Sequence, residues 1–329
     1  MLLLNADDVR RSLSMKEAIE AMKRAYTAIS DGKAVVPLRI RLSIPNSDAL
    51  SLFMPAYVHS EDSQALAIKV VSLFATNPAR GLEYIQAAVL VFNPETGQVI
   101  ALLEGSSLTA IRTGAAGGAA VDLLARKDSK ILAIFGAGAQ ARTQLEAACT
   151  ARNVETVFLF SLNTERAQVL VEEMKGKGPI PKDVRVARSP KEAIEYADVI
   201  CTATTSSKPV FEDKDLKAGV HISAVGSYTP EMQEVSAETL QRAKVFVDSR
   251  SAALEEAGDL IQPIRTGLFD ESHIYGELGE VVLGRIPGRQ SQEEITYFKS
   301  VGIAVQDAMA AQVALNNARK MNIGTEIDF

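Results

Sequence analysis

The sequence has 329 residues, a length that commonly folds as two domains. Hydrophobic residues make up 47% and charged residues 23%, which excludes a disordered chain, a collagen and a coiled coil. The net charge of -6, with scattered basic residues, indicates neither nucleic acid nor a membrane as partner. Two cysteines are too few for a disulfide framework, and no Cys-x-x-Cys or His-Glu-x-x-His spacing indicates a metal site. The first leucines are followed at once by acidic residues, so we expect no signal peptide and a cytoplasmic protein.

The first hundred residues predict an α+β unit. Ser14 to Glu17 form a capping-box pattern, and apolar residues follow at helical spacing. Residues 38–44 alternate strictly, which places Arg39, Arg41 and Ser43 on one face of a strand and the aliphatic residues on the other. Further strand-like runs, the last two joined by a turn, cover 52–57, 65–74, 84–92 and 99–103. A largely antiparallel sheet is expected.

After residue 106 the sequence becomes a helix rich in glycine and alanine that runs to about residue 126. Strands and helices then alternate, with strands expected at 131–135, 156–160, 199–202, 221–225 and 245–247. A last helix, from 303 to about 320, is expected to return to the N-terminal unit. The predicted fold class is α/β: a Rossmann-type doubly wound parallel sheet plus an α+β unit built from the N-terminal segment and the C-terminal helix.

A glycine-rich loop follows the first strand of the alternating region. It reads Gly136-Ala137-Gly138-Ala139-Gln140-Ala141, a Gly-x-Gly-x-x-Ala pattern that opens a helix. Gly136 permits the tight turn, Gly138 lets a pyrophosphate approach the backbone, and Ala141 permits close packing of the helix on the strand. The helix N-terminus attracts the anion. Because a strand precedes the loop and a helix and second strand follow it, we expect Gly136, Gly138, Ala139 and Gln140 to bind a dinucleotide.

The second strand of this region ends without the acidic residue that usually binds the ribose hydroxyls of NAD. Ser161, Asn163, Thr164 and Arg166 stand there instead, and they could accept a 2′-phosphate. We therefore expect NADP(H) as the favoured cofactor and NAD(H) as the alternative. The simpler interpretation is a turn followed by a helix that Thr164 caps.

Motifs along the whole chain bring a family into view. They are Phe53–Tyr57, Lys69–Val71, Leu108–Ala115, Gly136–Gln140, Ala224–Gly226, Val247–Arg250, Glu256–Leu260, Glu277–Glu280 and Phe298–Gly302. In this order they resemble the ornithine cyclodeaminase and mu-crystallin family. The resemblance implies a homodimer formed through a substrate-binding unit of residues 1–115 with 304–329. It implies a dinucleotide-binding domain over residues 116–303.

The resemblance also implies the residues of the site. Arg41 and Arg112 match arginines that hold the substrate carboxylate, and Lys69 matches a lysine beside the reacting carbon. A guanidinium fork suits a carboxylate, and a desolvated lysine can serve as acid or base. Arg39 lies on the same face as Arg41, so the two could exchange roles. Taken singly, Arg41 would be interpreted as a solvated strand residue, Arg112 as part of an internal ion pair and Lys69 as a snorkelling side chain.

Further cofactor contacts are expected on the dinucleotide-binding domain and next to it. Thr113 is expected as a hydroxyl donor, and Val301 and Gly302 are expected to pack on the nicotinamide. Two residues at the ends of predicted strands, Thr202 and Val225, complete the expected cofactor site.

One segment departs from the cyclodeaminase pattern. Cyclodeaminases carry an aspartate shortly after the Ala-Val-Gly stretch, where this chain has Tyr228 or its neighbours. A tyrosine with a pKa near ~10 cannot replace a carboxylate base at neutral pH. We therefore expect an NAD(P)H-dependent reductase of cyclic α-imino acids, which makes L-proline or L-pipecolate from Δ1-pyrroline- or Δ1-piperideine-2-carboxylate. The alternatives are an amino acid oxidoreductase of the alanine dehydrogenase type, an ornithine cyclodeaminase, and an NADPH-dependent ligand-binding protein of the mu-crystallin type.

Overall fold

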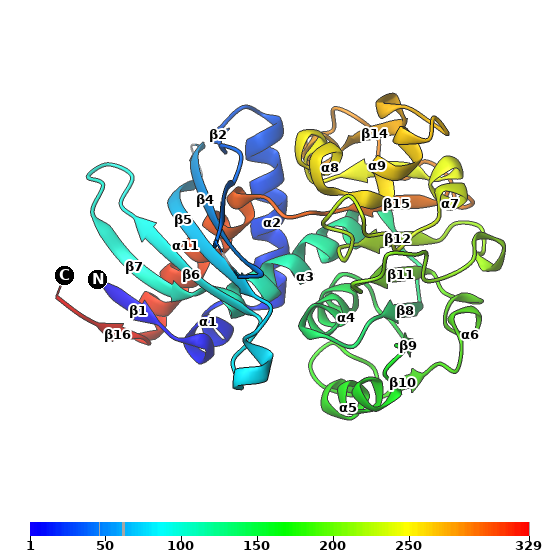
Figure 1. The fold of residues 1–329 in the computed structure, drawn as a ribbon, viewed down its shortest axis with the longest axis horizontal. Coiled ribbons are helices and arrows are strands. Elements are labelled where there is room, and N and C mark those ends of the chain that lie inside the picture. Colours follow the sequence, from blue (N-terminus) through cyan, green and yellow to red (C-terminus); the bar gives the residue numbers. More distant parts are fainter. Residues whose placement is uncertain (46, 61–62, 329) are drawn as a thin grey trace. The chain divides into compact units, whose positions relative to one another are not determined.

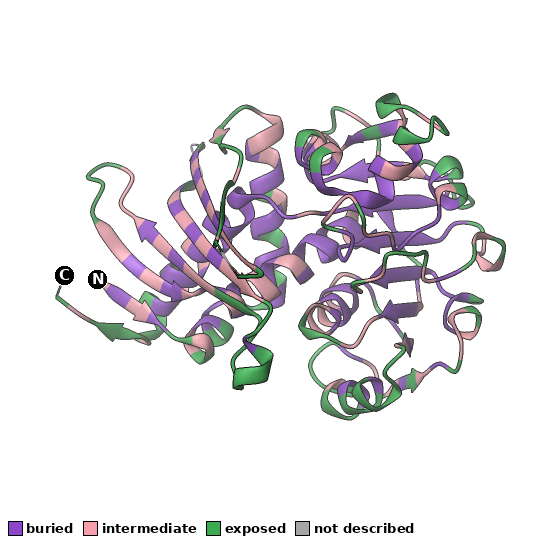
Figure 2. Ribbon diagram, viewed as in Figure 1, coloured by how far each residue is buried: buried purple, intermediate pink, exposed green. Residues whose placement is uncertain are grey.

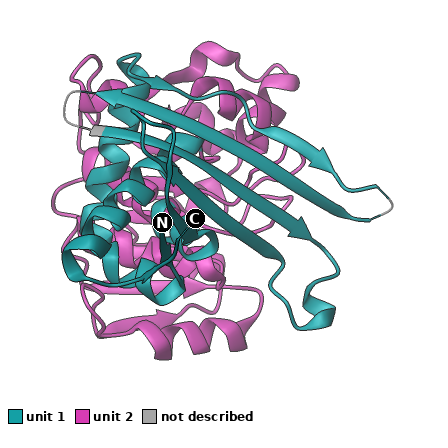
Figure 3. Ribbon diagram, turned by 90° about the vertical axis from the view of Figure 1, so that its left-hand side faces the viewer, with its two compact units in different colours: residues 1–112, 303–329 teal, residues 113–302 magenta. Residues whose placement is uncertain are grey.

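The computed structural model describes residues 1–45, 47–60 and 63–328. The chain divides into two compact units, which Figure 3 shows in different colours. Unit 1 comprises Met1–Arg112 and Ile303–Phe329, and unit 2 comprises Thr113–Gly302. The sequence analysis placed these boundaries after residues 115 and 303, whereas the structure has them after Arg112 and Gly302.

Unit 1 is built on a mostly antiparallel sheet of eight strands (Figure 1). The strand order is β16-β1-β7-β6-β5-β4-β2, and β3 pairs with β4 beside this path. The strands are β1 (Leu2–Leu4), β2 (Ala34–Val35), β3 (Ile40–Ser43), β4 (Ala49–Ser60), β5 (Ser63–Phe74), β6 (Ile85–Phe92), β7 (Val99–Glu104) and β16 (Thr325–Glu326). The predicted α+β unit with antiparallel pairing is confirmed, and β1 and β7 add a parallel pair.

Helices cover one face of this sheet. They are α1 (Ala6–Ser12), α2 (Met15–Ser30) and α11 (Ala304–Met321), with a single 3-10 turn, η1 (Pro78–Arg80), on a loop. The hydroxyl of Ser14 accepts the amide of Glu17 at 3.3 Å, so the cap predicted for the first long helix is present. The C-terminal helix α11 packs against α2, β4 and β5, which confirms that the chain returns to the N-terminal unit.

Unit 2 is built on a sheet of eight parallel strands in the order β10-β9-β8-β11-β12-β15-β13-β14. The strands are β8 (Ile131–Phe135), β9 (Thr156–Phe160), β10 (Asp183–Val186), β11 (Val199–Thr202), β12 (His221–Ala224), β13 (Lys244–Val247), β14 (Ile274–Glu277) and β15 (Thr296–Lys299). The predicted doubly wound parallel sheet is confirmed. Three of its strands, β10, β14 and β15, were not predicted, and each has four residues.

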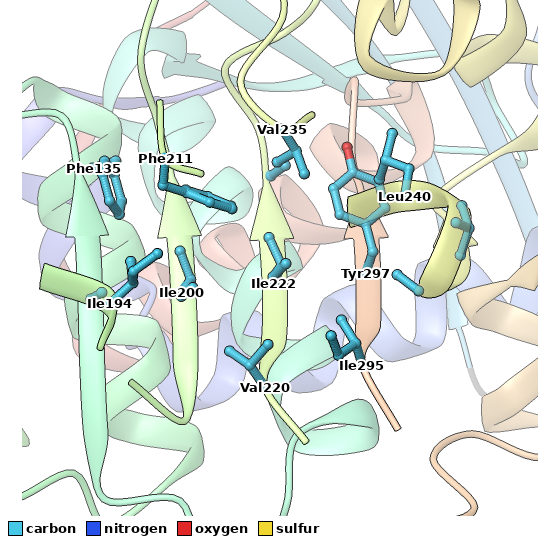
Figure 4. Close-up of a cluster of buried hydrophobic side chains, with 14 of the residues drawn as sticks. Phe135, Ile194, Ile200, Phe211, Val220, Ile222, Val235, Leu240, Ile295 and Tyr297 are labelled. Carbon is cyan, nitrogen blue, oxygen red and sulfur yellow. The ribbon is translucent and has the colours of Figure 1, made fainter. Parts of the chain in front are cut away.

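Helices and apolar side chains cover both faces of the parallel sheet. The helices are α3 (Gly105–Leu124), which crosses the unit boundary, α4 (Ala139–Ala151), α5 (Thr164–Met174), α6 (Pro190–Ile194), α7 (Ala237–Arg242), α8 (Arg250–Glu256), α9 (Gly258–Arg265) and α10 (Leu278–Val282), with 3-10 turns η2 (Asp213–Asp215) and η3 (Glu271–His273). Figure 4 shows one core cluster, in which Ile200, Ile222 and Tyr297 project from neighbouring strands. Every residue of β11, β12 and β15 is buried (Figure 2). Burial on both faces explains why these strands lack a polar alternation.

The strand order places a topological switch point between β8 and β11. From β8 the chain proceeds to β9 and β10 on one side, and then returns to β11 on the other side of β8. Loops that leave the carboxyl ends of two such strands diverge, and ligands of doubly wound sheets bind in the crevice between them. The fold therefore points to the residues that follow β8 and β11. Separately, no helix in the described ranges has the length and apolar character that a bilayer crossing requires.

Candidate functional site: a dinucleotide loop and a buried charge cluster

The glycine-rich loop lies at this switch point. Gly136 has φ 107, and a Cβ built there would lie 2.5 Å from the carbonyl oxygen of Ala203, which follows β11. Gly138 is the N-cap of α4, with no side-chain cap, and a Cβ built there would meet nothing within 4 Å. The first turn of α4, which begins with Ala139 and Gln140, therefore presents backbone amides to open space. Such a cradle fits the pyrophosphate of a dinucleotide.

At the tip of β9 the helix cap differs from the simpler interpretation of the sequence. Asn163, rather than Thr164, caps α5, because its Oδ1 accepts the amide of Arg166 at 2.8 Å. The amide of Asn163 in turn donates to the hydroxyl of Ser161 at 3.2 Å. Thr164 and the Arg166 side chain are exposed. In doubly wound folds the residues that follow this second strand lie near the ribose of a bound dinucleotide.

Thr202, one of the expected cofactor residues, makes a buried hydrogen bond within unit 2. Its side chain is fully buried, and its hydroxyl donates to Oε2 of Glu234 at 2.9 Å. Its carbonyl oxygen accepts the amide of Val225 at 3.0 Å, so these two expected residues are joined to each other. Thr113, at the start of unit 2, accepts the side-chain amide of Gln144 on its carbonyl oxygen at 2.9 Å. The hydroxyl of Thr202 is thus used by Glu234, and a contact between Thr202 and a cofactor stays a prediction.

A buried aspartate holds the last two expected cofactor residues. Oδ2 of Asp248 accepts the amides of Val301 at 3.0 Å and Gly302 at 2.8 Å, and the hydroxyl of Ser300 at 2.8 Å. Burial raises the pKa of Asp248, while the hydrogen bond from the Gly302 amide opposes that shift. The segment Val301–Gly302, which follows β15, is thus held by hydrogen bonds to Asp248, which follows β13.

Unit 1 contains a second candidate site, a cluster of three buried charges. Nζ of Lys69, on β5, lies 2.7 Å from Oδ2 of Asp307 on α11. Nε of Arg112, on α3, donates to Oδ1 of the same carboxylate at 2.9 Å. All three side chains are at least nine-tenths buried. Asp307 therefore bridges the two cations that the sequence assigned to the substrate.

A neighbouring glutamine fixes the orientation of the Arg112 fork. Oε1 of Gln306 accepts Nη1 of Arg112 at 2.8 Å, and its Nε2 donates to the hydroxyl of Tyr26 at 2.6 Å. In the part of the chain that the structure describes, Nη2 of Arg112 has no hydrogen-bond partner. Arg112 thus forms the internal ion pair that its simplest interpretation foresaw, and it still has donors left for an anion.

Burial and charge together bring Lys69 into the range where a lysine exchanges protons near neutral pH. Its pKa falls from 10.5 to about 8, chiefly because burial removes the ammonium from water. The charge of Asp307 opposes this fall, and the charges of Arg112 and Arg39 add to it. For Asp307, burial would raise the pKa, but the charges of Arg112 and Lys69 outweigh burial and hold it below its ordinary value.

Arg39 and Arg41 differ in their relation to this cluster. Arg39 precedes β3, and Arg41 lies on β3 opposite Leu52 of β4. Arg41 is exposed, whereas Arg39 is half-buried and its charge lowers the pKa of Lys69. The structure therefore brings Lys69 and Arg112 together, leaves Arg41 exposed and leaves Arg39 half-buried.

Asp307 was not among the residues singled out in the sequence. The one available signal was the polar pair Gln306-Asp307 inside a helix that is otherwise rich in alanine. A polar pair on a buried helix face needs partners, but the sequence does not name them. Among the described residues, no group of three or more His, Cys, Asp or Glu side chains could hold a metal ion.

Comparisons with known proteins show similarity along the whole length of this chain. The family model "Ornithine cyclodeaminase/mu-crystallin family" matches residues 1–322. A Δ1-pyrroline-2-carboxylate reductase from Bacillus cereus is 41% identical over 330 residues, which span 100% of both chains. A structure of the Thermococcus litoralis Δ1-pyrroline-2-carboxylate reductase in complex with NADH and L-proline is 43% identical, covers 99% of this chain and 100% of its own, and has a TM-score of 0.93.

An archaeal alanine dehydrogenase dimer with bound NAD is also similar, with 32% identity and a TM-score of 0.91 over 100% of this chain and 99% of its own. The motifs that carried the resemblance are therefore accompanied by full-length similarity in sequence and fold. This chain belongs to the ornithine cyclodeaminase/mu-crystallin family.

Proposed function

We propose that this chain is an NAD(P)H-dependent reductase of cyclic α-imino acids, which converts Δ1-pyrroline- or Δ1-piperideine-2-carboxylate into L-proline or L-pipecolate. The observation that carries the proposal is the buried cluster of Lys69, Arg112 and Asp307, in which two cations face one carboxylate. A surplus positive charge in a buried place is stabilised by an anionic ligand. The similarity to reductases named for pyrroline-2-carboxylate, one of them bound to NADH and L-proline, supports an imino acid as that ligand.

In this proposal, unit 1 holds the imino acid. Arg112 binds the substrate carboxylate through Nη2, since Nε and Nη1 are already used by Asp307 and Gln306. Arg39 takes the second carboxylate contact, which the sequence analysis gave to Arg41, because Arg39 is half-buried whereas Arg41 is exposed. Lys69 donates a proton to the imine nitrogen, a role for which an acid with a pKa of about 8 is suited.

Unit 2 holds the cofactor through Gly136, Gly138 and the first turn of α4. A reduced nicotinamide supplies the hydride to the imine carbon when it is bound. We propose that NADP(H) is favoured over NAD(H), because the tip of β9 carries the exposed Arg166 and no acidic residue in the turn before α5. The related structures contain NADH or NAD, so a chain that accepts both cofactors is the alternative.

We also propose that the protein is a homodimer formed through unit 1. Alternate aliphatic side chains on β3 and just before it are not covered, since Leu38, Ile40 and Leu42 are 68%, 63% and 50% exposed. A strand that exposes consecutive outward aliphatic residues is typical of an association surface. Ile40→Glu should convert the dimer into a monomer in light scattering after gel filtration, and a monomeric wild-type protein would contradict the proposal.

The cyclodeaminase alternative has less support. Tyr228 stands in the segment where cyclodeaminases carry their aspartate, and its side chain is 39% exposed. No carboxylate takes that position in the segment Gly226–Pro230.

One assay tests the proposed function. The purified protein is mixed with NADPH or NADH and, in separate samples, pyrroline-2-carboxylate, piperideine-2-carboxylate, or pyruvate with ammonia, and with ornithine plus NAD. The absorbance of the reduced cofactor is followed. We expect rapid oxidation of the cofactor with a cyclic imino acid and little change with the other samples. Turnover of pyruvate with ammonia alone, or of ornithine alone, would replace the proposal with an alanine dehydrogenase or a cyclodeaminase.

A further inference from the structure

A buried glutamate joins the two strand ends next to the dinucleotide loop. Oε1 of Glu234 accepts hydrogen bonds from the amide of Thr204 at 2.6 Å and from its hydroxyl at 2.8 Å. Oε2 accepts the hydroxyl of Thr202 at 2.9 Å and the amide of Gly226 at 2.7 Å. The side chain is fully buried. Four donors thus converge on one carboxylate, which is about the number that its lone pairs can accept.

These donors lie at the carboxyl ends of two neighbouring strands, β11 and β12. Thr202 ends β11, Thr204 follows it, and Gly226 comes just after β12. Between the two threonines lies Ala203, whose carbonyl oxygen comes within 2.5 Å of the Cβ that Gly136 lacks. The segment that Glu234 fixes is therefore the one against which the first glycine of the dinucleotide loop turns.

The glutamate is itself held in place by a second carboxylate. Oδ1 of Asp259 accepts the amides of Glu234 at 2.7 Å and Val235 at 3.1 Å. Oδ2 of Asp259 accepts the hydroxyl of Tyr297 at 3.0 Å and Nζ of Lys299 at 3.3 Å. The carboxylate and the backbone amide of Glu234 are both hydrogen-bonded, so any other rotamer of its side chain would lose hydrogen bonds.

We propose that Glu234 is a positioning residue for the dinucleotide: it ties the ends of β11 and β12 together, holds Ala203 against Gly136, and so sets the shape of the cofactor cradle. It contacts the cofactor only through the backbone that it fixes. This inference rests on the proposed function, because it requires that the chain binds NAD(P)H.

The test is Glu234→Gln, which keeps the size of the side chain and replaces one acceptor oxygen with an amino group. On either side the new amino group faces one backbone amide, which loses its acceptor, so we expect the affinity for NADH to fall at least ~10-fold. Binding is measured by titration of NADH fluorescence. The matched control is Glu231→Gln, the same change at an exposed residue three positions away, which should bind NADH like the wild type.

Kinetics separate positioning of the cofactor from general damage. In Glu234→Gln, the KM for NADH should rise, while the KM for the imino acid at saturating NADH stays at the wild-type value. Thr202→Val removes a single donor and should weaken NADH binding by a smaller factor, and Thr202→Ser, which keeps the hydroxyl, should restore it.

Each outcome decides between the two proposals. A wild-type protein that does not bind NADH or NADPH overturns the proposed function and this inference with it. A folded Glu234→Gln that binds NADH as tightly as the wild type overturns the inference alone. Should Glu234→Gln fail to fold in circular dichroism, Thr202→Val decides: unchanged NADH affinity overturns the inference, and weakened affinity with rescue by serine supports it.

Discussion

The two units bury charged groups in different ways. In unit 1, Lys69 and Arg112 share the single carboxylate of Asp307, and Nη2 of Arg112 has no partner among the described residues. In unit 2, by contrast, backbone amides and hydroxyls occupy the carboxylates of Glu234 and Asp248. The network of unit 1 has a donor without a partner, whereas the donors named in the network of unit 2 are all used.

This difference indicates that the network of unit 1 belongs to a binding site and that the network of unit 2 supports the backbone around one. A buried network whose hydrogen bonds are complete holds backbone in place and gains nothing from a ligand. A buried network with an unmatched cation remains costly until an anion arrives, so it is suited to bind one. Variants that remove the charges of unit 1 one at a time test whether this network binds the substrate. A variant at the tip of β9 tests the cofactor site of unit 2.

The largest effect is expected from Lys69→Ala. Loss of a positioned acid commonly costs ~10²- to 10⁴-fold in rate, so we expect kcat for imino acid reduction to fall into that range. NADH affinity, measured by fluorescence, should not change, because Lys69 belongs to unit 1. Lys16→Ala, at an exposed residue of α2, is the matched control and should be as active as the wild type. A Lys69→Ala enzyme as fast as the wild type would remove Lys69 from the site.

Asp307→Asn should have the next largest effect. Without the carboxylate, two buried cations face each other unpaired, and breaking such a pair costs ~3 kcal/mol or more of stability. The melting temperature should fall. Because Asp307 raises the pKa of Lys69, its loss should also move the alkaline limb of the activity profile to lower pH. An unshifted pH profile in a folded variant would show that Asp307 does not act on Lys69.

The wild-type enzyme should show opposite pH dependences in its two directions. Reduction needs the Lys69 ammonium, so its rate should be high below a pH of about 8 and fall as the pH rises through that value. Oxidation of L-proline needs the free amine as base, so its rate should rise over the same range. Initial rates with NADPH and with NADP check both limbs. Parallel profiles in the two directions would exclude Lys69 as the group that transfers the proton.

The smallest effect is expected from Arg166→Ala at the tip of β9. Loss of one charge-assisted contact to the 2′-phosphate should raise the KM for NADPH by ~10-fold and leave the KM for NADH unchanged. Arg188→Ala, at another exposed arginine of unit 2, serves as control. Equal changes with both cofactors would show that Arg166 does not recognise the 2′-phosphate.

Much of the fold followed from local signals. The bounds of β8, β9 and β11 match the predicted strands, because each is a short apolar run whose ends are marked by polar or glycine residues. The strand β15 escaped prediction because it contains Thr296 and Lys299, which are polar yet fully buried. Their burial is tolerable only because His221 and Asp259 lie beside them, and those partners come from distant parts of the chain.

The site was predictable in kind but not in its pairings. The sequence singled out Lys69, Arg112 and Arg41, and it noted that Arg39, on the same face of the predicted strand, could exchange roles with Arg41. Which of the two arginines approaches Lys69 depends on the register in which β3 pairs with β4 and β4 pairs with β5. Asp307 lies 195 residues from Arg112 along the chain, so no spacing rule connects them.

By itself, then, the sequence determined the parallel sheet, the glycine loop at its first strand and the types of side chain that the chemistry uses, because periodicity, glycine conformation and charge act over a few neighbouring residues. The tertiary structure alone decided that α11 brings Asp307 between two cations and that Glu234 joins the ends of two strands. Burial, ion pairing and the resulting pKa of Lys69 depend on contacts between distant segments, and such contacts exist only after the chain has folded.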